Sequence, residues 1–302
     1  MRLLVTGATG FLGRHILAAA TNETVFRATR ATNAAIPGDI ALGPELWTQA
    51  DFSQALAATQ PDIVIHCAGT AMHTRDARKC FDANVVLAAG LLNAVAKLAK
   101  PPRVILIGSA AEYGVVSREA LPVAETHPCA PRTIYGVAKH AQSLLGFAFA
   151  MRGLPVLVAR LFNPVGAGMP KQLALPSFAR QIVGPMAQAT VRVGDLSAER
   201  DFIDVEEAAR LILALASLPH WPWPLVHICS GRAYRLGHLL DEMAAMSGVS
   251  VKIELDPALL RPGDMRVLAG STKRLESANL VPRAPDFSIL LPRSLMEARG
   301  SD

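Results

Sequence analysis

The first half of the chain alternates short apolar runs with longer segments of helical periodicity. Most of the apolar runs carry Val, Ile and Leu without polar alternation, which is typical of strands covered on both faces. They predict strands at Leu3–Thr6, Val25–Ala28, Asp62–Ala68, Arg103–Gly108 and Pro155–Leu161. Helices are expected between them, near residues 11–20, 51–59, 75–98 and 134–152. This alternation predicts an α/β fold with a doubly wound parallel sheet.

The pattern loosens after about residue 164, where Pro and Gly become frequent. Arg200–Val205 and Val226–Cys229 are apolar enough to predict a return of the chain to the main sheet. We therefore expect a large domain over residues 1–164 with returns near 200–235. Residues 165–199 and 236–302 are expected to form a smaller lobe.

The composition narrows the classes of function. The 302 residues are 51% apolar and 18% charged, which supplies a sizeable core. The net charge of +5 comes without a run of five basic residues, so no nucleic-acid partner is expected. No apolar run reaches about 18 residues and the start is too short for a signal peptide, so neither a membrane span nor a leader is expected. The four cysteines lack C-x-x-C or metal-type spacing, which favours a reducing cytoplasm and no metal site.

A glycine-rich turn, Gly7-Ala8-Thr9-Gly10-Phe11-Leu12-Gly13, follows the first strand and opens the first helix. Glycines permit a tight turn and close approach to a pyrophosphate, and the N–H groups at the helix start then face the anion. The spacing is G-x-x-G-x-x-G, and the strand and helix around it strengthen the signal. We therefore predict a dinucleotide-binding turn made of Gly7, Thr9, Gly10, Phe11, Leu12 and Gly13.

The end of the second strand bears on the choice between NAD and NADP. An acid about 20 residues after the glycines would bind the 2′-hydroxyl of NAD. The chain instead carries Arg27 and Arg30 there, and the next acid is Asp39. Arg30, together with Arg27, can pair with a 2′-phosphate, so NADP (NADPH) is favoured over NAD. A solvated arginine at a strand end is the ordinary alternative.

Tyr135 and Lys139 lie four residues apart on a predicted helix and so share a face. A free phenol has a pKa near 10, and an adjacent ammonium lowers it. Such a pair can exchange a proton with a carbonyl or alcohol oxygen while a hydride moves at the carbon. Ser109 follows the strand Arg103–Gly108, at the sheet edge where ligands bind, and its hydroxyl can orient the reacting oxygen. A surface helix pair and a turn-capping serine are the alternatives.

Together these motifs resemble the extended short-chain dehydrogenase/reductase family, which includes the NAD-dependent epimerases and dehydratases, over nearly the whole chain. Further marks are the strand end His66-Cys67-Ala68-Gly69 and Asn84. The resemblance implies a Rossmann-type domain with a C-terminal substrate-binding lobe. It makes Ser109, Tyr135 and Lys139 the catalytic triad, with Tyr135 and Lys139 also contacting the cofactor. It places Ala68 and Gly69 beside the cofactor, with Asn84 in support.

The same resemblance points to the substrate. Arg160-Leu161-Phe162-Asn163-Pro164 is similar to a strand-end motif in which Phe162 and Pro164 would contact nicotinamide and Asn163 the nucleotide-sugar. Arg200 and Arg261 lie in segments similar to those that bind the substrate diphosphate, and Arg180 lies in a further matching stretch, Pro176–Ile182. Bidentate arginine suits that role. A structural ion pair with a neighbouring Asp is the alternative for Arg200 and Arg261.

The residues at positions 110 and 111 narrow the choice among the reactions of this family. Ala110-Ala111 stands where the family's 4,6-dehydratases carry an Asp-Glu pair, and Ala111 stands where its 3,5-epimerases carry a Cys. The stretches Gly108–Gly114 and Pro176–Ile182 resemble GDP-4-keto-6-deoxy-mannose reductases. We expect an NADPH-dependent 4-ketoreductase of a 4-keto-6-deoxy nucleotide-sugar. A C4 epimerase with tightly bound NAD and a non-catalytic NAD(P)-binding regulatory module are the alternatives. The family also implies a homodimer through the helices near 75–98 and 134–152.

Overall fold

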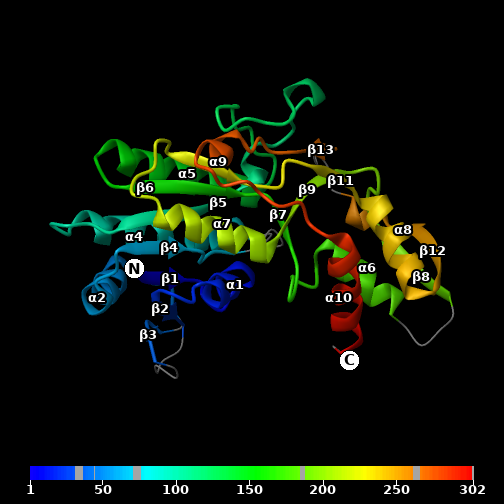
Figure 1. Ribbon diagram of the computed structural model, residues 1–302, viewed down its shortest axis with the longest axis horizontal. Coiled ribbons are helices and arrows are strands. Elements are labelled where there is room, and N and C mark those ends of the chain that lie inside the picture. The colour runs from blue at the N-terminus through cyan, green and yellow to red at the C-terminus, as the bar shows by residue number, and fades with distance from the viewer. Residues whose placement is uncertain (31–36, 44, 71–75, 184–187, 261–265, 301–302) are drawn as a thin grey trace.

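Seven parallel strands form the central sheet of the computed structural model (Figure 1), which describes residues 1–30, 37–43, 45–70, 76–183, 188–260 and 266–300. In sheet order they are β10 (Leu225–Ile228), β6 (Val156–Leu161), β5 (Arg103–Ser109), β4 (Ile63–His66), β1 (Arg2–Thr6), β2 (Thr24–Thr29) and β3 (Asp39–Ala41). The interior strands are buried almost throughout, as their unbroken apolar runs require. The doubly wound α/β fold is confirmed, and the five predicted strands lie within about two residues of their expected bounds.

The order of the strands reverses between β1 and β4. Strands β2 and β3 follow β1 towards one edge of the sheet, and β5, β6 and β10 follow β4 towards the other edge. In such sheets the ligand site lies outside the carboxyl ends of the strands at the reversal. The glycine turn follows β1 and Ser109 ends β5, so the topology brings both to this edge.

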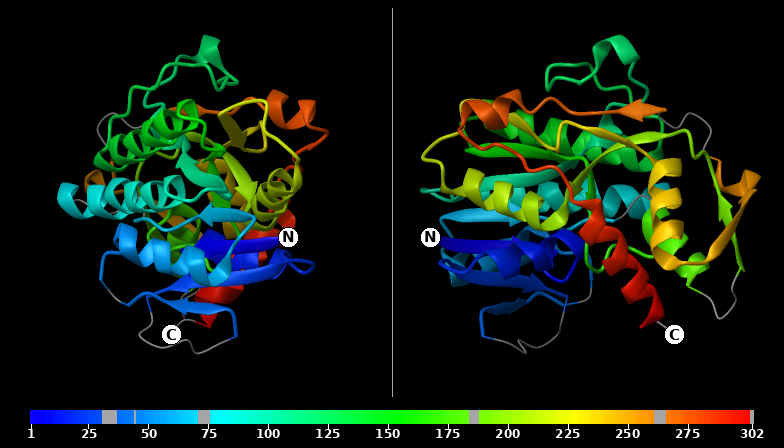
Figure 2. Two further views of the ribbon diagram at one scale, coloured as in Figure 1. Left: turned by 90° about the vertical axis from the view of Figure 1, so that its left-hand side faces the viewer. Right: turned by 45° about the vertical axis from the view of Figure 1, so that its right-hand side comes forward.

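Helices cover both faces of the sheet (Figure 2). One face packs against α1 (Phe11–Ala19) and α7 (Val205–Ser217), and the other against α2 (Gln49–Thr59), α4 (Leu87–Ala96) and α5 (Ile134–Met151). Side chains define where three of these helices start. The Thr48 and Asp51 side chains form a capping box at α2, Thr133 caps α5, and Asp204 caps α7.

The prediction that Val226–Cys229 returns to the main sheet is confirmed by β10, but the same prediction for Arg200–Val205 is wrong. That segment is a strand, β9 (Glu199–Asp204), in a second sheet with β7 (Asn163–Val165), β11 (Ala233–Arg235) and β13 (Val267–Leu268). The edge beside β6 is already taken by β10. The buried Asp201 carboxylate of β9 also accepts hydrogen bonds from the N–H groups of Ser230, Gly231 and Gly270, which fixes β9 against those loops.

A smaller body lies beside the sheet (Figure 1, right). The helices α6 (Ala174–Ile182), α8 (Leu236–Ser247) and α10 (Phe287–Arg299) surround one apolar cluster with the parallel pair β8 (Gln188–Val193) and β12 (Ser250–Leu255). Strand β8 alternates buried and exposed residues because only one of its faces is covered. Helix α9 (Lys273–Ser277) falls in the segment predicted for this lobe, yet its Leu275 packs into the core beneath the main sheet.

One continuous helical stretch, Ala77–Ala96, consists of α3 (Ala77–Phe81), a π-helical turn η1 (Asp82–Val86) and α4. Its 20 residues and mean hydropathy of 1.3 meet the length and composition of a membrane span, although 44% of the apolar window is buried. Leu87, Leu91 and Leu92 pack into the core cluster on the sheet, and this burial accounts for the apolar composition. The remaining short turns of 3-10 helix are η2 (Ala110–Glu112), η3 (Arg118–Ala120) and η4 (Pro257–Leu259).

Candidate active site

The glycine turn is built for close backbone approach. Gly7 has φ +66°, and a Cβ there would lie 2.6 Å from the backbone nitrogen of Ala68. A Cβ on Gly13 would lie 2.2 Å from the Gly7 carbonyl oxygen. Gly10 caps α1 without any side-chain hydrogen bond, and the first turn of α1 has no acidic residue. The helix start therefore keeps its N–H groups and positive dipole for an anion, and these residues fit the pyrophosphate of a dinucleotide.

The other residues of the turn differ in exposure. Thr9 and Gly10 are exposed at its tip, whereas Leu12 is buried in the main core. Phe11 is half-buried, with its ring against His15 at a centroid distance of 5.7 Å. Any contact of Leu12 with a cofactor is therefore left to its backbone.

Asn84 lies next to the end of β4. Its Nδ2 donates to the Cys80 carbonyl oxygen at 2.8 Å and to Thr70 Oγ1 at 3.1 Å. Its buried Oδ1 has no hydrogen-bond partner among the described residues, and it lies 2.6 Å from where a Cβ on Gly69 would be. Asn84 belongs to the π-helical turn, a local feature that often marks functional sites. The structure thus brings Asn84 and Gly69 together, and their contact with the cofactor stays a prediction.

Arg30 and Arg27 have different environments. Arg27 is bound to Asp39, with its Nε 2.6 Å from Oδ1. Asp39 is the first acid after β2, and this pair occupies it. Arg30 directly follows β2 and is exposed. Because Arg27 and Asp39 bind each other, neither is available to recognise the 2′-hydroxyl of NAD or the 2′-phosphate of NADP. Arg30 therefore remains as the predicted partner of a 2′-phosphate.

Ser109 is fixed by a capping box at the end of β5. Its Oγ accepts a hydrogen bond from Ala111 N at 3.2 Å, and its own N–H donates to Glu112 Oε1 at 2.8 Å. The chain therefore turns into η2 immediately after Ser109. This places the hydroxyl at the carboxyl edge of the sheet, near enough to the Tyr135 phenol to influence its pKa.

Tyr135 stands in the first turn of α5, where Gly136 permits a close approach to η2. A Cβ on Gly136 would lie 2.5 Å from the Ala111 carbonyl oxygen. The pKa of Tyr135 is raised to about 12, chiefly by burial; the Ser109 hydroxyl lowers it in part, and the charge of Glu112 adds to the rise. The lowering of this pKa by Lys139, which the sequence predicts, is not observed. The phenol is protonated at neutral pH, the form needed to donate a proton.

Lys139 lies one turn further along α5 and is 5% exposed. Its Nζ donates to the Ile107 carbonyl oxygen at 2.5 Å and to Gln142 Oε1 at 2.7 Å. Burial lowers the pKa of the ammonium to about 8, while the charge of Glu112 raises it. The sequence predicts the lysine but not its partner Gln142.

The residues of the motif Arg160–Pro164, at the end of β6, lie in different parts of the fold. The ring of Phe162 is 3% exposed and packs against His227 at a centroid distance of 5.0 Å. Asn163 and Pro164 are half-buried in β7, and Asn163 Nδ2 donates to the Asp201 carbonyl oxygen at 2.9 Å. The Phe162 ring thus belongs to a core cluster, and the nicotinamide contacts stay a prediction for Phe162 and Pro164.

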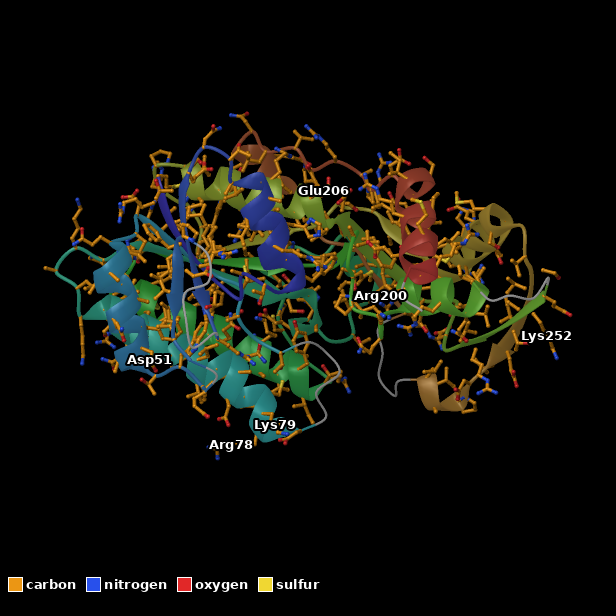
Figure 3. The ribbon with its side chains drawn as sticks, turned by 90° about the horizontal axis from the view of Figure 1, so that it is seen from below. Asp51, Arg78, Lys79, Arg200, Glu206 and Lys252 are labelled. Carbon is orange, nitrogen blue, oxygen red and sulfur yellow. The ribbon has the colours of Figure 1, made fainter. Side chains whose placement is uncertain are left out.

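The predicted diphosphate-binding arginines do not form one described cluster. Arg200 is half-buried in β9 and donates from Nη1 to the Glu199 carbonyl oxygen at 3.0 Å. Figure 3 places it at the junction between the main sheet and the smaller lobe. Arg180 is exposed in the last turn of α6. Arg261 lies outside the described residues.

A buried polar network behind Ser109 is absent from the sequence-based prediction. Arg160 Nη2 contacts Glu112 Oε2 at 2.7 Å, and the Arg160 guanidinium stacks over the Tyr113 ring at 4.5 Å. Burial alone raises the pKa of Glu112, but His140, Arg160 and the Ser109 N–H outweigh it and lower the pKa.

The same network brings together three groups able to bind a metal. Glu112, Cys129 and His140 place their ligand atoms within 4.8 Å of one another. The Arg160 guanidinium already neutralises that carboxylate, so these residues do not fit a cation. The cluster is instead the support of Ser109, which a Ser-x-x-Glu spacing signals.

The comparisons with known proteins agree with this geometry. Residues 3–221 match the NAD dependent epimerase/dehydratase family. The chain is 32% identical to a GDP-6-deoxy-D-mannose reductase of Pseudomonas aeruginosa, over 91% of this chain and 89% of that protein. It is 31% identical to a dTDP-6-deoxy-L-talose 4-dehydrogenase (NAD(P)(+)) of Kitasatospora kifunensis, over 85% and 82%.

The solved structure of RMD from Pseudomonas aeruginosa complexed with NADPH superimposes with a TM-score of 0.81 at 25% identity, covering 100% of both chains. Fold, glycine turn and Ser–Tyr–Lys arrangement therefore lead to one conclusion. The chain belongs to the NAD-dependent epimerase/dehydratase family and is an NAD(P)-dependent enzyme of the extended short-chain dehydrogenase/reductase type.

Proposed function

We propose that this protein is an NADPH-dependent 4-ketoreductase of a 4-keto-6-deoxy nucleotide-sugar. The observation that carries the proposal is that the Ser109 hydroxyl lies close enough to a protonated Tyr135 phenol to lower its pKa, with the Lys139 ammonium one turn away. A ketone reduction needs a proton donor at the carbonyl oxygen, and this arrangement supplies one. The reductase and dehydrogenase relatives favour the same chemistry.

A reduced nicotinamide cofactor held by the Gly7–Gly13 turn would supply the hydride. Ser109 donates a hydrogen bond to the carbonyl oxygen and orients it for that transfer. Tyr135 donates its proton to that oxygen as negative charge develops there. Lys139 does not shift the Tyr135 pKa in this structure, and we propose that its positive charge stabilises the phenolate in the complex with substrate and cofactor. Together these groups convert the ketone to an alcohol without a further acid or base.

Elimination of water is not favoured at this site. A dehydratase needs a free acid or base near the sugar, and Ala110 and Ala111 supply none. Glu112, the acid that follows them, is fully buried and bound to Ser109 N and Arg160. Both oxygens of its carboxylate already accept hydrogen bonds from the protein, so we propose no catalytic role for Glu112.

NADPH is proposed as the electron donor because exposed Arg30, and no free acid, follows β2 among the described residues. The NADPH complex of the similar RMD structure supports this choice. Arg200 and Arg180 are proposed to contact the substrate diphosphate.

We further propose a homodimer, a cytoplasmic location and no membrane or nucleic-acid partner. Val137, Leu144 and Met151 recur every seven residues on α5, so they lie on one face, and all three are exposed. Such an apolar stripe favours contact with a second copy of the chain. The four cysteines are free, which favours a reducing compartment.

The direct test is a screen of 4-keto-6-deoxy nucleotide-sugars against NADPH and NADH, followed by absorbance at the nicotinamide band. We expect stoichiometric oxidation of NADPH with at least one of them. Interconversion of 4-hydroxy nucleotide-sugars by protein that carries co-purified NAD, without net NADPH oxidation, would instead identify an epimerase. Cofactor binding without either reaction would favour a regulatory module.

A further inference from the structure

The Lys139 ammonium is held by two neutral acceptors. Nζ donates to the Ile107 carbonyl oxygen at 2.5 Å and to Gln142 Oε1 at 2.7 Å. An ammonium has three N–H bonds and no acceptor. One of these bonds is thereby directed towards β5 and one onward along α5, and the third is left.

Gln142 is itself held in place. It is fully buried, and its Nε2 donates to the same Ile107 carbonyl oxygen at 3.2 Å. Residues three apart share a helix face, so Gln142 sits directly beside Lys139. The amide, the ammonium and the carbonyl oxygen therefore form a closed set of three hydrogen bonds in which Gln142 cannot easily turn away.

We propose that Gln142 is a positioning residue of the reductase: its amide oxygen fixes the Lys139 ammonium and leaves a single N–H bond for the nicotinamide ribose. The inference rests on the proposed function. Gln142 is fully buried and is assigned no contact with substrate or cofactor, so it acts through Lys139.

The neutrality of the acceptor matters as much as its position. The titratable groups that interact with Lys139 or share its helix turn are His66, Cys67, Cys80, Glu112, Tyr135 and His140. The only carboxylate among them, Glu112, is paired with Arg160. A carboxylate at position 142 would neutralise the ammonium, and the stabilisation of a Tyr135 phenolate would be lost. An amide holds the ammonium and leaves its charge in place.

The test uses two variants of nearly the same size. In Gln142→Met the acceptor is lost, so the buried ammonium is less stable and its pKa falls. In Gln142→Glu a charged acceptor replaces the amide, so the pKa rises. The titration of Lys139 is followed by NMR in purified protein with ¹³C-labelled lysine, without added cofactor.

We expect Lys139 to titrate near pH 8 in the wild type. It should titrate about one pH unit or more lower in Gln142→Met and about one unit or more higher in Gln142→Glu. Ser143→Ala is the matched control, because Ser143 is the next residue on α5 and its buried hydroxyl has no hydrogen-bond partner among the described residues. Its Lys139 titration should stay at the wild-type value.

Turnover provides the second readout. Both variants at position 142 should lower kcat about tenfold or more, with the KM for the nucleotide-sugar within about twofold of wild type. Lys139 titrations that coincide in all four proteins would overturn the role of Gln142. Because the titration needs no substrate, it tests Gln142 even if the wild type reduces no 4-keto sugar, a result that would overturn only the proposed function.

Discussion

The Arg160 guanidinium donates to the Glu112 carboxylate at 2.7 Å, and neither side chain is more than 1% exposed. The second oxygen of that carboxylate accepts from the Ser109 backbone N–H at 2.8 Å. The ion pair therefore joins β6 to the turn that carries the proposed catalytic hydroxyl. The position of Ser109 therefore depends on the buried Arg160–Glu112 ion pair, to which we assign no contact with the substrate.

Glu112→Gln should destabilise the fold and impair catalysis together. The neutral amide leaves the Arg160 charge buried without a counter-ion, which costs about 3–5 kcal/mol of unfolding free energy. Urea unfolding followed by circular dichroism measures this loss. Glu206→Gln is the matched control, since Glu206 is exposed and lies 3.4 Å from Arg293 at the surface; it should cost less than about 1 kcal/mol. Equal losses in the two variants would contradict the role given to Glu112.

Arg30→Ala should weaken the binding of NADPH selectively. Loss of a charged hydrogen-bond donor to the 2′-phosphate lowers NADPH affinity by roughly 10- to 100-fold and leaves NADH affinity unchanged. Quenching of protein fluorescence by each cofactor gives the two dissociation constants. The control is Arg152→Ala, an exposed arginine beyond α5. A similar loss of affinity for NADH and NADPH would show that Arg30 does not recognise the 2′-phosphate.

The rate of ketone reduction should fall at alkaline pH. Burial lowers the pKa of Lys139 to about 8, so its charge is present below that pH and is lost above it. We expect kcat/KM to fall towards tenfold per pH unit beyond about pH 8. In Lys139→Arg the guanidinium stays charged, so this fall should disappear even if the rate is lower. A wild-type profile that stays flat to pH 9.5 would argue against a charged Lys139 in catalysis.

The proposed dimer should depend on the exposed stripe of α5. Leu144→Glu places a charge in the middle of the Val137–Met151 face and should convert the dimer to a monomer. Light scattering after gel filtration measures the mass. Ile253→Glu, an equally exposed apolar residue on β12, is the control and should leave the mass unchanged. A dimer that survives Leu144→Glu would place the interface elsewhere.

The parts of the site that could be predicted are those with short sequence signals. The glycine turn, the Tyr135–Lys139 spacing and the position of Ser109 after an apolar strand each follow from local geometry. The supporting residues also carry local signals. Glu112 completes a Ser-x-x-Glu capping box, and Gln142 lies one helical turn from Lys139.

Other features depend on contacts between distant segments. Arg160 meets Glu112 across 48 positions of sequence, and Asp201 binds the N–H of Gly270 across 69. No periodicity reveals such pairs. For the same reason the sequence assigns β9 to the wrong sheet: a short apolar strand shows that it is buried, not which neighbour it pairs with.

The central claim is that the Tyr135 phenol delivers the proton to the reduced carbonyl. Turnover of NADPH with a 4-keto-6-deoxy nucleotide-sugar, measured side by side for wild type and Tyr135→Phe, tests it most directly. We predict a fall in kcat of about 10²- to 10⁴-fold in the variant with the dissociation constant for NADPH within about twofold of wild type. Turnover by Tyr135→Phe within about tenfold of wild type would contradict the mechanism.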